Sequence, residues 1–216
     1  IVMPSNMSEE RKQMLKFYGA DLIQVEAGDF DGAIETRDTM AKSFGWFNCN
    51  QFHNPLNILA HYNTTGPEID KQFRKANAYE QIWPWPQAFV VGTGTGGTIM
   101  GCGEYLKEKF PGIRLIAVEP AESAVMSGGE PGLHGIQGIG DGSKFLVDLN
   151  KIDGVKTIPT ECAKKVAKYL AKRYGLFVGI SAGANVMASF QWLRDNNQQT
   201  AITILCDRGE RYFSCL

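Results

Sequence analysis

The sequence has 216 residues, of which 44% are hydrophobic and 21% are charged, a balance typical of a folded globular protein. Its 22 basic and 23 acidic side chains nearly cancel, so the charge gives no reason to expect nucleic acid or an anionic membrane as a partner. No apolar run approaches the length of a membrane span, and the cysteines and histidines lack metal-ligand spacing, so we predict neither a membrane segment nor a metal site.

Strand and helix patterns alternate along the chain. In order, we predict a strand at 1–3, a helix at 9–18, a strand at 21–25, a helix at 31–44, a weak strand at 46–48, a helix at 67–76, a strand at 88–91, a helix ending near 110, a strand at 114–118, helices at 161–174 and 182–194, and a strand at 201–205. This alternation predicts an α/β fold with parallel sheets covered by helices on both faces.

Two segments break this alternation. Trp83-Pro84-Trp85-Pro86 is incompatible with regular structure, so we expect the chain to cross between two lobes there. Residues 127–142 hold seven glycines without periodicity, and long loops of this kind inside compact domains are typically functional. The five cysteines, an odd number without CxxC spacing, are typical of reduced thiols, so we predict a cytoplasmic protein. Cys102, on the helix after residue 96, is expected to be a small core residue.

The densest motif is the run Gly92-Thr93-Gly94-Thr95-Gly96-Gly97-Thr98, which follows a predicted strand and opens a predicted helix. Backbone N–H groups at a helix N-terminus bind phosphate, so we interpret the run as a phosphate-binding loop. Its three threonines add hydroxyl groups, which favours the several oxygens of a terminal phosphate monoester over a pyrophosphate. A glycine turn needed only for close strand–helix packing is the structural alternative.

The same run also satisfies the dinucleotide fingerprint, as Gly92-x-Gly94-x-x-Gly97. Glu119 ends the next predicted strand, where an acid that binds a ribose would lie. A Rossmann-type NAD(P)-binding oxidoreductase is therefore an alternative hypothesis. The Lys-Ser/Thr ending of a nucleoside-triphosphate loop is absent, which argues against triphosphate hydrolysis.

Further segments resemble the cysteine synthase and cystathionine β-synthase family of fold-type II enzymes, which use pyridoxal 5'-phosphate (PLP). In family order, the similar segments are Met3-Pro4-Ser5-Asn6-Met7-Ser8-Glu9-Glu10-Arg11, Gly19-Ala20-Asp21-Leu22, Gln51-Phe52-x-Asn54-Pro55-x-Asn57, Thr64-Thr65-Gly66-Pro67-Glu68-Ile69, Val118-Glu119-Pro120, Ser127-Gly128-Gly129-x-Pro131-Gly132-x-His134, Ile136-Gln137-Gly138-Ile139-Gly140, Gly179-Ile180-Ser181-x-Gly183-Ala184 and Gly209-Glu210-Arg211-Tyr212. The resemblance implies open parallel sheets of the tryptophan-synthase-β type. It also implies the remainder of a smaller N-terminal lobe at 1–62 and a larger cofactor-binding lobe at 63–216.

The resemblance also implies roles for particular residues. The cofactor phosphate would lie against Gly94, Thr95, Gly96, Gly97 and Thr98. Ser181 would hydrogen-bond the pyridine nitrogen, although a helix N-cap is the structural alternative for a serine at that place. Gln51 would contact the substrate carboxylate, or serve as a structural amide in its loop. Gly138 would border the active site, and Glu119 would be structural.

The implied reaction is a β-replacement that makes L-cysteine from O-acetylserine, or a similar activated serine, and sulfide through α-aminoacrylate. The resemblance further suggests a homodimer and, as a partner, the C-terminus of serine acetyltransferase. The family's Schiff-base lysine and its Thr-Ser-Gly-Asn-Thr-Gly loop do not occur here, so the sequence looks N-terminally truncated, with no catalytic residue of its own. We expect the chain alone to be inactive, and a non-enzymatic partner that has lost the lysine is a third hypothesis.

Departures from the family pattern leave the leaving group and the nucleophile open. Asp141-Gly142-Ser143-Lys144-Phe145 stands where the family commonly has Ala-Gly-Phe-Ile-Pro, and Ala182 stands where many members have a second serine.

Overall fold

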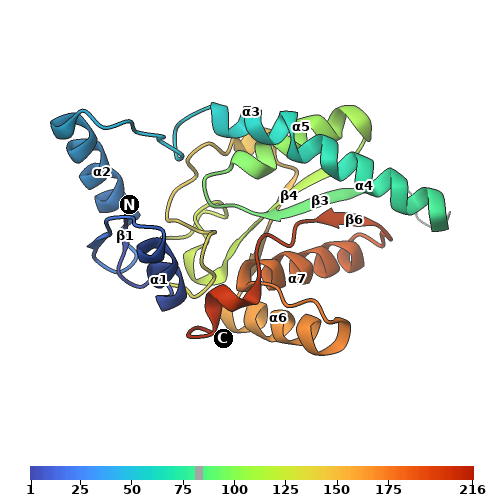
Figure 1. The fold of residues 1–216 in the computed structure, drawn as a ribbon. Helices are drawn as coiled ribbons and strands as arrows, with labels where there is room; N and C mark the ends of the chain where they lie inside the picture. Colours follow the sequence, from blue (N-terminus) through green and yellow to red (C-terminus); the bar gives the residue numbers. More distant parts are fainter. Residues whose placement is uncertain (81–84) are drawn as a thin grey trace.

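The computed structural model describes residues 1–80 and 85–216. Its main sheet has four parallel strands in the order β5-β4-β3-β6, and a smaller parallel pair joins β1 and β2 (Figure 1). The strands are β1 (Val2–Pro4), β2 (Ile23–Val25), β3 (Ala88–Gly92), β4 (Arg114–Pro120), β5 (Gly154–Ile158) and β6 (Ala201–Thr203). The prediction of parallel sheets in an α/β fold is confirmed.

Helices cover both faces of the main sheet. α3 (Leu56–Asn63), α4 (Thr65–Glu80) and α5 (Gly97–Lys109) lie on one face, and α6 (Thr160–Tyr174) and α7 (Ile180–Asp195) lie on the other (Figure 1). The N-terminal segment, with α1 (Glu9–Phe17) and α2 (Phe30–Phe44), forms a separate layer beside the carboxyl ends of the main strands (Figure 1). Three short 3₁₀ turns complete the described regular structure: η1 (Ala121–Ser123), η2 (Leu149–Lys151) and η3 (Gly209–Tyr212).

The core forms around the two central strands, β3 and β4, which are almost continuously apolar and buried, as expected for parallel strands with helices on both sides. Alternate side chains enter two separate clusters. Phe89 and Leu115 pack with Leu106 of α5, whereas Val90 and Val118 pack on the opposite face, which α7 covers.

The predictions of secondary structure were wrong at three places. Residues 46–48 form no strand, and both α3 and β5 were missed. Strand β5 pairs only with β4 at the edge of the sheet and is only partly buried, so its short sequence lacks the apolar run of a central strand. Helix α3 was missed because it follows a polar segment broken by Pro55.

The predicted lobe boundaries remain untested. Residues 83 and 84 of the predicted crossing lie outside the described residues. Helix α3 packs on α5, and a Cβ added to Gly101 of α5 would overlap the carbonyl oxygen of Ile58. We therefore propose that the larger lobe begins before α3 rather than at residue 63.

Candidate cofactor and substrate site

The glycine run forms the turn between the carboxyl end of β3 and the N-terminus of α5 (Figure 1). Gly96 caps the helix in the left-handed region, at φ 90°. The backbone N–H groups of residues 94, 95, 96 and 98 donate to no acceptor within residues 1–80 and 85–216. Unused donors at the positive end of a helix dipole form an anion site, so the backbone fits a phosphate group.

Two side chains of α3 position the threonine hydroxyls of this turn. Asn57 Nδ2 donates to Thr95 Oγ1 at 3.0 Å, and His61 Nε2 lies 3.2 Å from Thr98 Oγ1. Burial lowers the pKa of His61, so its ring is neutral near pH 7, and its Nδ1 lies 2.9 Å from Thr65 Oγ1. Because Thr95 Oγ1 accepts from Asn57, its own hydrogen remains available to a bound anion.

Thr93 differs from the other two threonines. Its buried hydroxyl donates to the carbonyl oxygen of Val118 at 3.1 Å, within the strand layer. The expectation that all three threonines offer hydroxyl groups to a phosphate is therefore wrong for Thr93.

A second loop, residues 138–147, lies directly against the glycine turn. Gly140 N donates to Thr93 O at 2.9 Å, and Leu146 N donates to Thr95 O at 3.1 Å. A Cβ on Gly94 would lie 2.7 Å from the carbonyl oxygen of Gly138, so the two backbones meet where a side chain has no room. The structure thus brings Gly138 next to the glycine turn, while its role toward substrate remains a prediction.

Ser181 is buried in the first turn of α7, at 4% exposure. The N-cap of this helix is Gly179, so the N-cap alternative for Ser181 is wrong. Burial raises the pKa of the Cys206 thiol, which a hydrogen bond with Ser181 partly offsets. One turn later, Asn185 Oδ1 accepts from Gly92 N at 2.7 Å and its Nδ2 donates to Ile204 O at 2.8 Å. This amide therefore joins α7 to the glycine turn and to the segment after β6.

Gln51 lies in an exposed turn before α3. Its carbonyl oxygen accepts from Asn57 Nδ2 at 3.0 Å, the same amide group that holds Thr95. The backbone of Gln51 is thereby fixed near the glycine turn. Its side chain makes no hydrogen bond within the described chain, so contact with a substrate carboxylate remains a prediction.

Glu119 is buried at the end of β4, at 1% exposure, and both of its carboxylate oxygens are occupied. Oε2 accepts from Met126 N at 2.7 Å, and Oε1 accepts from Ser127 N at 3.0 Å and Ser127 Oγ at 2.6 Å. The carboxylate thus holds a turn of its own chain and has no oxygen free for a ribose. This geometry supports the structural role of Glu119 and removes the acid on which the dinucleotide hypothesis depends.

We expect Glu119→Gln to lower the free energy of unfolding by about 1–3 kcal/mol, because its amide nitrogen must face a buried N–H donor. Urea denaturation checks this value. Glu130→Gln, in an exposed position of the same loop region, is the control and should leave stability unchanged. Equal stability of the two variants would contradict the structural role.

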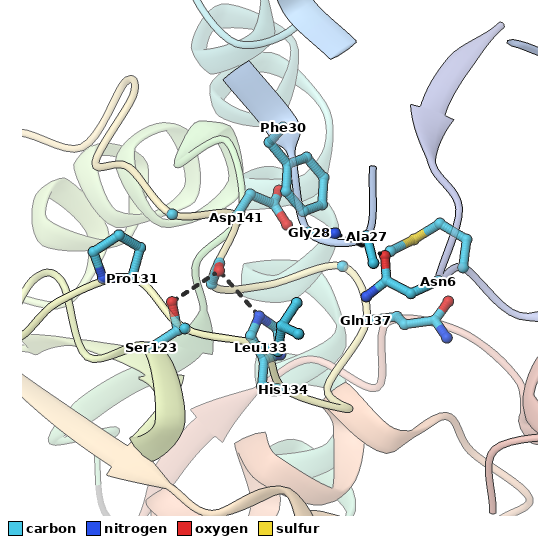
Figure 2. A pocket seen from close by; sticks show the side chains of 15 residues that line it. Asn6, Ala27, Gly28, Phe30, Ser123, Pro131, Leu133, His134, Gln137 and Asp141 are labelled. Atoms are coloured by element: carbon cyan, nitrogen blue, oxygen red, sulfur yellow. Dashed lines mark hydrogen bonds between the residues drawn. The ribbon is translucent and has the colours of Figure 1, made fainter. Parts of the chain in front are cut away.

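Between the N-terminal segment and the loops that follow β4 lies a cavity of about 220 Å³ (Figure 2). Gly28 and Phe30 contribute one side, and His134, Gly138 and Asp141 contribute the other. His134 Nε2 lies 3.0 Å from Gly140 O while its Nδ1 accepts from Ile136 N, and burial lowers its pKa. Ligands of parallel sheets bind at the carboxyl ends of strands, which is where this cavity lies.

Comparisons with known proteins agree with this geometry. Residues 1–207 match the sequence profile of the family described as pyridoxal-phosphate dependent enzyme. The chain belongs to this family. A cysteine synthase of Staphylococcus aureus is 37% identical over 98% of the chain and 67% of its own length.

Solved structures show the same relationship. A cysteine synthase of Entamoeba histolytica is 38% identical with a TM-score of 0.85, covering 100% of this chain and 62% of that one. An O-acetylserine dependent cystathionine β-synthase of Helicobacter pylori is 36% identical with a TM-score of 0.83, covering 99% of this chain and 68% of that one. The chain therefore spans about two thirds of the length of these relatives. The resemblance, the fold class and the cofactor predicted from the sequence are confirmed.

Cys102 is fully buried, at 0% exposure. Burial raises the pKa of the Cys102 thiol to about 12, as expected for a core residue rather than a nucleophile. Within the described chain, no cluster of three or more His, Cys, Asp or Glu side chains is arranged for a metal ion. The described helices also include none with the length and apolar character required to cross a bilayer.

Four residues of the site received no role from the sequence: Asn57, His61, Asp141 and Asn185. Asn57 and His61 share one helix face at i, i+4 spacing, as do Ser181 and Asn185. The sequence signal for these residues was the i, i+4 spacing of two polar side chains on a helix that packs against the glycine turn.

Proposed function

We propose that the protein catalyses β-replacement on an activated serine, with O-acetylserine as the amino-acid substrate, sulfide as the nucleophile and L-cysteine as the product. The main support is the set of unused N–H donors at residues 94, 95, 96 and 98, next to a cavity at the carboxyl ends of the sheet. The name of the Staphylococcus aureus relative, cysteine synthase, supports the same activity.

In this proposal the phosphate of PLP lies on the backbone of residues 94–98, with Thr95 and Thr98 donating from positions that α3 fixes. Ser181 holds the pyridine nitrogen. A neutral hydroxyl leaves that nitrogen unprotonated, which moderates electron withdrawal and favours loss of a β-substituent. When bound, PLP delocalises the electron pair released at the substrate α-carbon.

We further propose that Gln51 orients the substrate carboxylate and that Gly138 lets the substrate approach the backbone. No lysine lines the cavity within the described chain, so we assign the Schiff base to none of the described lysines. Four of them pair with surface acids, as Lys12–Glu9, Lys107–Asp153, Lys156–Asp195 and Lys164–Glu161.

We also propose a cytoplasmic homodimer, with the serine acetyltransferase C-terminus as a partner. Three large exposed side chains, Phe44, Trp46 and Phe47, gather at the end of α2, and such groups mark interaction surfaces. Light scattering of the purified protein should give twice the monomer mass.

The test of this function uses protein expressed from its complete reading frame and loaded with PLP. We expect O-acetylserine and sulfide to yield cysteine, detected by acid ninhydrin or mass spectrometry. Saturable NAD(P)H binding without any effect of PLP would favour the oxidoreductase alternative. PLP binding without turnover of any β-substituted serine would instead favour the non-enzymatic partner.

A further inference from the structure

Asp141 lies where the glycine turn and the cavity meet. A Cβ on Gly94 would lie 3.2 Å from Asp141 Oδ2, and the same side chain lines the cavity together with Phe30. In Figure 2 its carboxyl group projects from the loop toward the Phe30 side of the cavity. The carboxylate therefore faces the space that the proposed function gives to the reactants.

No structural role accounts for this carboxylate. Glu119 accepts three hydrogen bonds, and Asp153 accepts Leu115 N at 2.9 Å and pairs with Arg114. Asp141 accepts a hydrogen bond from no residue in 1–80 or 85–216. A partly buried carboxylate that lines a cavity and that no protein donor holds is typical of a group that serves function rather than the fold.

The charged groups around Asp141 do not cancel the effect of its burial. Burial raises the pKa of Asp141 to about 6, against an opposing attraction from Arg11 of α1. His134 lines the same cavity and burial lowers its pKa, so its ring is neutral at pH 7, and Glu122 of η1 acts on His134. Asp141 is thus ionised at neutral pH yet more basic than an ordinary aspartate, which suits a proton acceptor.

We propose that Asp141 accepts the proton of the incoming nucleophile, so that the site uses neutral thiol or hydroxyl compounds as well as sulfide. This inference rests on the proposed β-replacement. The S–H or O–H bond of the nucleophile breaks, its proton moves to a carboxylate oxygen of Asp141, and its electron pair forms the bond to the substrate β-carbon. The substrate α-carbon takes up one proton from solvent and Asp141 returns its own proton to solvent, so the protons balance over the cycle.

The two classes of nucleophile depend differently on such an acceptor. A hydrosulfide anion has already lost its proton and is repelled by a carboxylate, whereas a thiol near pH 7 is mostly protonated and needs a base. Asp141 therefore sets nucleophile choice, at a position where the family pattern commonly has alanine.

The test compares PLP-loaded wild-type protein, expressed from its complete reading frame, with Asp141→Asn, and uses Glu130→Gln as a matched control in the same loop region. O-Acetylserine is the donor, and 2-mercaptoethanol or sodium sulfide is the nucleophile. At pH 7 we expect Asp141→Asn to lower kcat/KM for the thiol by about 100-fold or more, and that for sulfide by less than about threefold. The thiol reaction should also lose its acid limb near pH 6.

A second measurement needs no activity. Because the pKa of Asp141 is raised in the folded state, the native protein holds more protons than the unfolded chain between about pH 4 and pH 6. Wild-type stability must then fall, relative to Asp141→Asn, as pH rises through this window, and the difference must be constant above it. Urea midpoints at several pH values report this change.

The outcomes separate the two proposals. Equal losses with thiol and sulfide, an unchanged thiol rate, or a pH-independent difference in urea midpoint would overturn the role of Asp141. Failure of the wild type with both nucleophiles would overturn the proposed β-replacement and this role with it, while the urea midpoints would still report the ionisation of Asp141.

Discussion

Gly97→Ala should weaken PLP binding by about 10- to 100-fold, which corresponds to about 1.4–2.8 kcal/mol. A Cβ at this position would overlap Oδ1 of Asn57, the residue whose Nδ2 holds the Thr95 hydroxyl. Asn57 must move, so Thr95 loses its partner at the phosphate site. Alanine is itself a better helix former than glycine, so the loss should appear in cofactor affinity more than in stability. Equilibrium dialysis or the fluorescence of bound PLP measures the affinity.

Two further variants test whether overlap with Asn57 causes the expected loss of PLP affinity. Gly154→Ala adds a methyl group on edge strand β5, where it meets Ile116 Cδ1 at an ordinary 3.4 Å, and should leave PLP affinity unchanged. In an Asn57→Ala background, Gly97→Ala should lower PLP affinity only slightly further, because the side chain that its Cβ would overlap is absent. Full additivity of the two substitutions would contradict the explanation.

Asn185→Ala should lower the free energy of unfolding by about 2–4 kcal/mol. The substitution leaves Gly92 N and Ile204 O without their partner and opens a cavity beside α7 at a fully buried position. Asn196→Ala, at the C-cap of the same helix, is the control, because its Nδ2 also bonds a carbonyl, Trp192 O, but in an exposed position. We expect that control to cost about 1 kcal/mol or less in urea denaturation. A cost for Asn185→Ala no larger than the control would contradict the role of this amide.

The central sheet and the glycine turn could be predicted from the sequence because their signals are local. The strands β3 and β4 are uninterrupted apolar runs, and the turn between β3 and α5 needs glycines within seven consecutive residues. Strand β5 was missed because the edge of a sheet demands less apolar character than its centre.

The partners of the turn could not be predicted, since they come from distant segments. Thr93 and Thr95 are the same residue type two positions apart, yet one faces β4 and the other faces Asn57. Glu119 fitted two hypotheses equally well in the sequence, and only the position of the N–H groups at 126 and 127 decides between them.

A sequence motif also does not show which of its residues lie at the site and which serve packing. Ser181 and Gly183 belong to one similar segment, but a Cβ on Gly183 would overlap Ala163 O, so this glycine allows close packing of α7 on α6. The sequence segment alone does not separate Ser181, for which we propose a role in binding the cofactor, from the packing residue Gly183.

The side-chain amide of Asn57 links two segments of the site. Its Nδ2 donates to Gln51 O in the exposed turn and to Thr95 Oγ1 in the glycine turn. With the roles proposed for Gln51 and for residues 94–98, a rearrangement of that turn on substrate binding would reach the proposed phosphate site through the side chain of Asn57. Thermodynamic linkage then makes the effect mutual: by whatever factor substrate changes the affinity for cofactor, cofactor changes the affinity for substrate. Cofactor loading and substrate capture would thus be cooperative without a hinge or a subunit rotation.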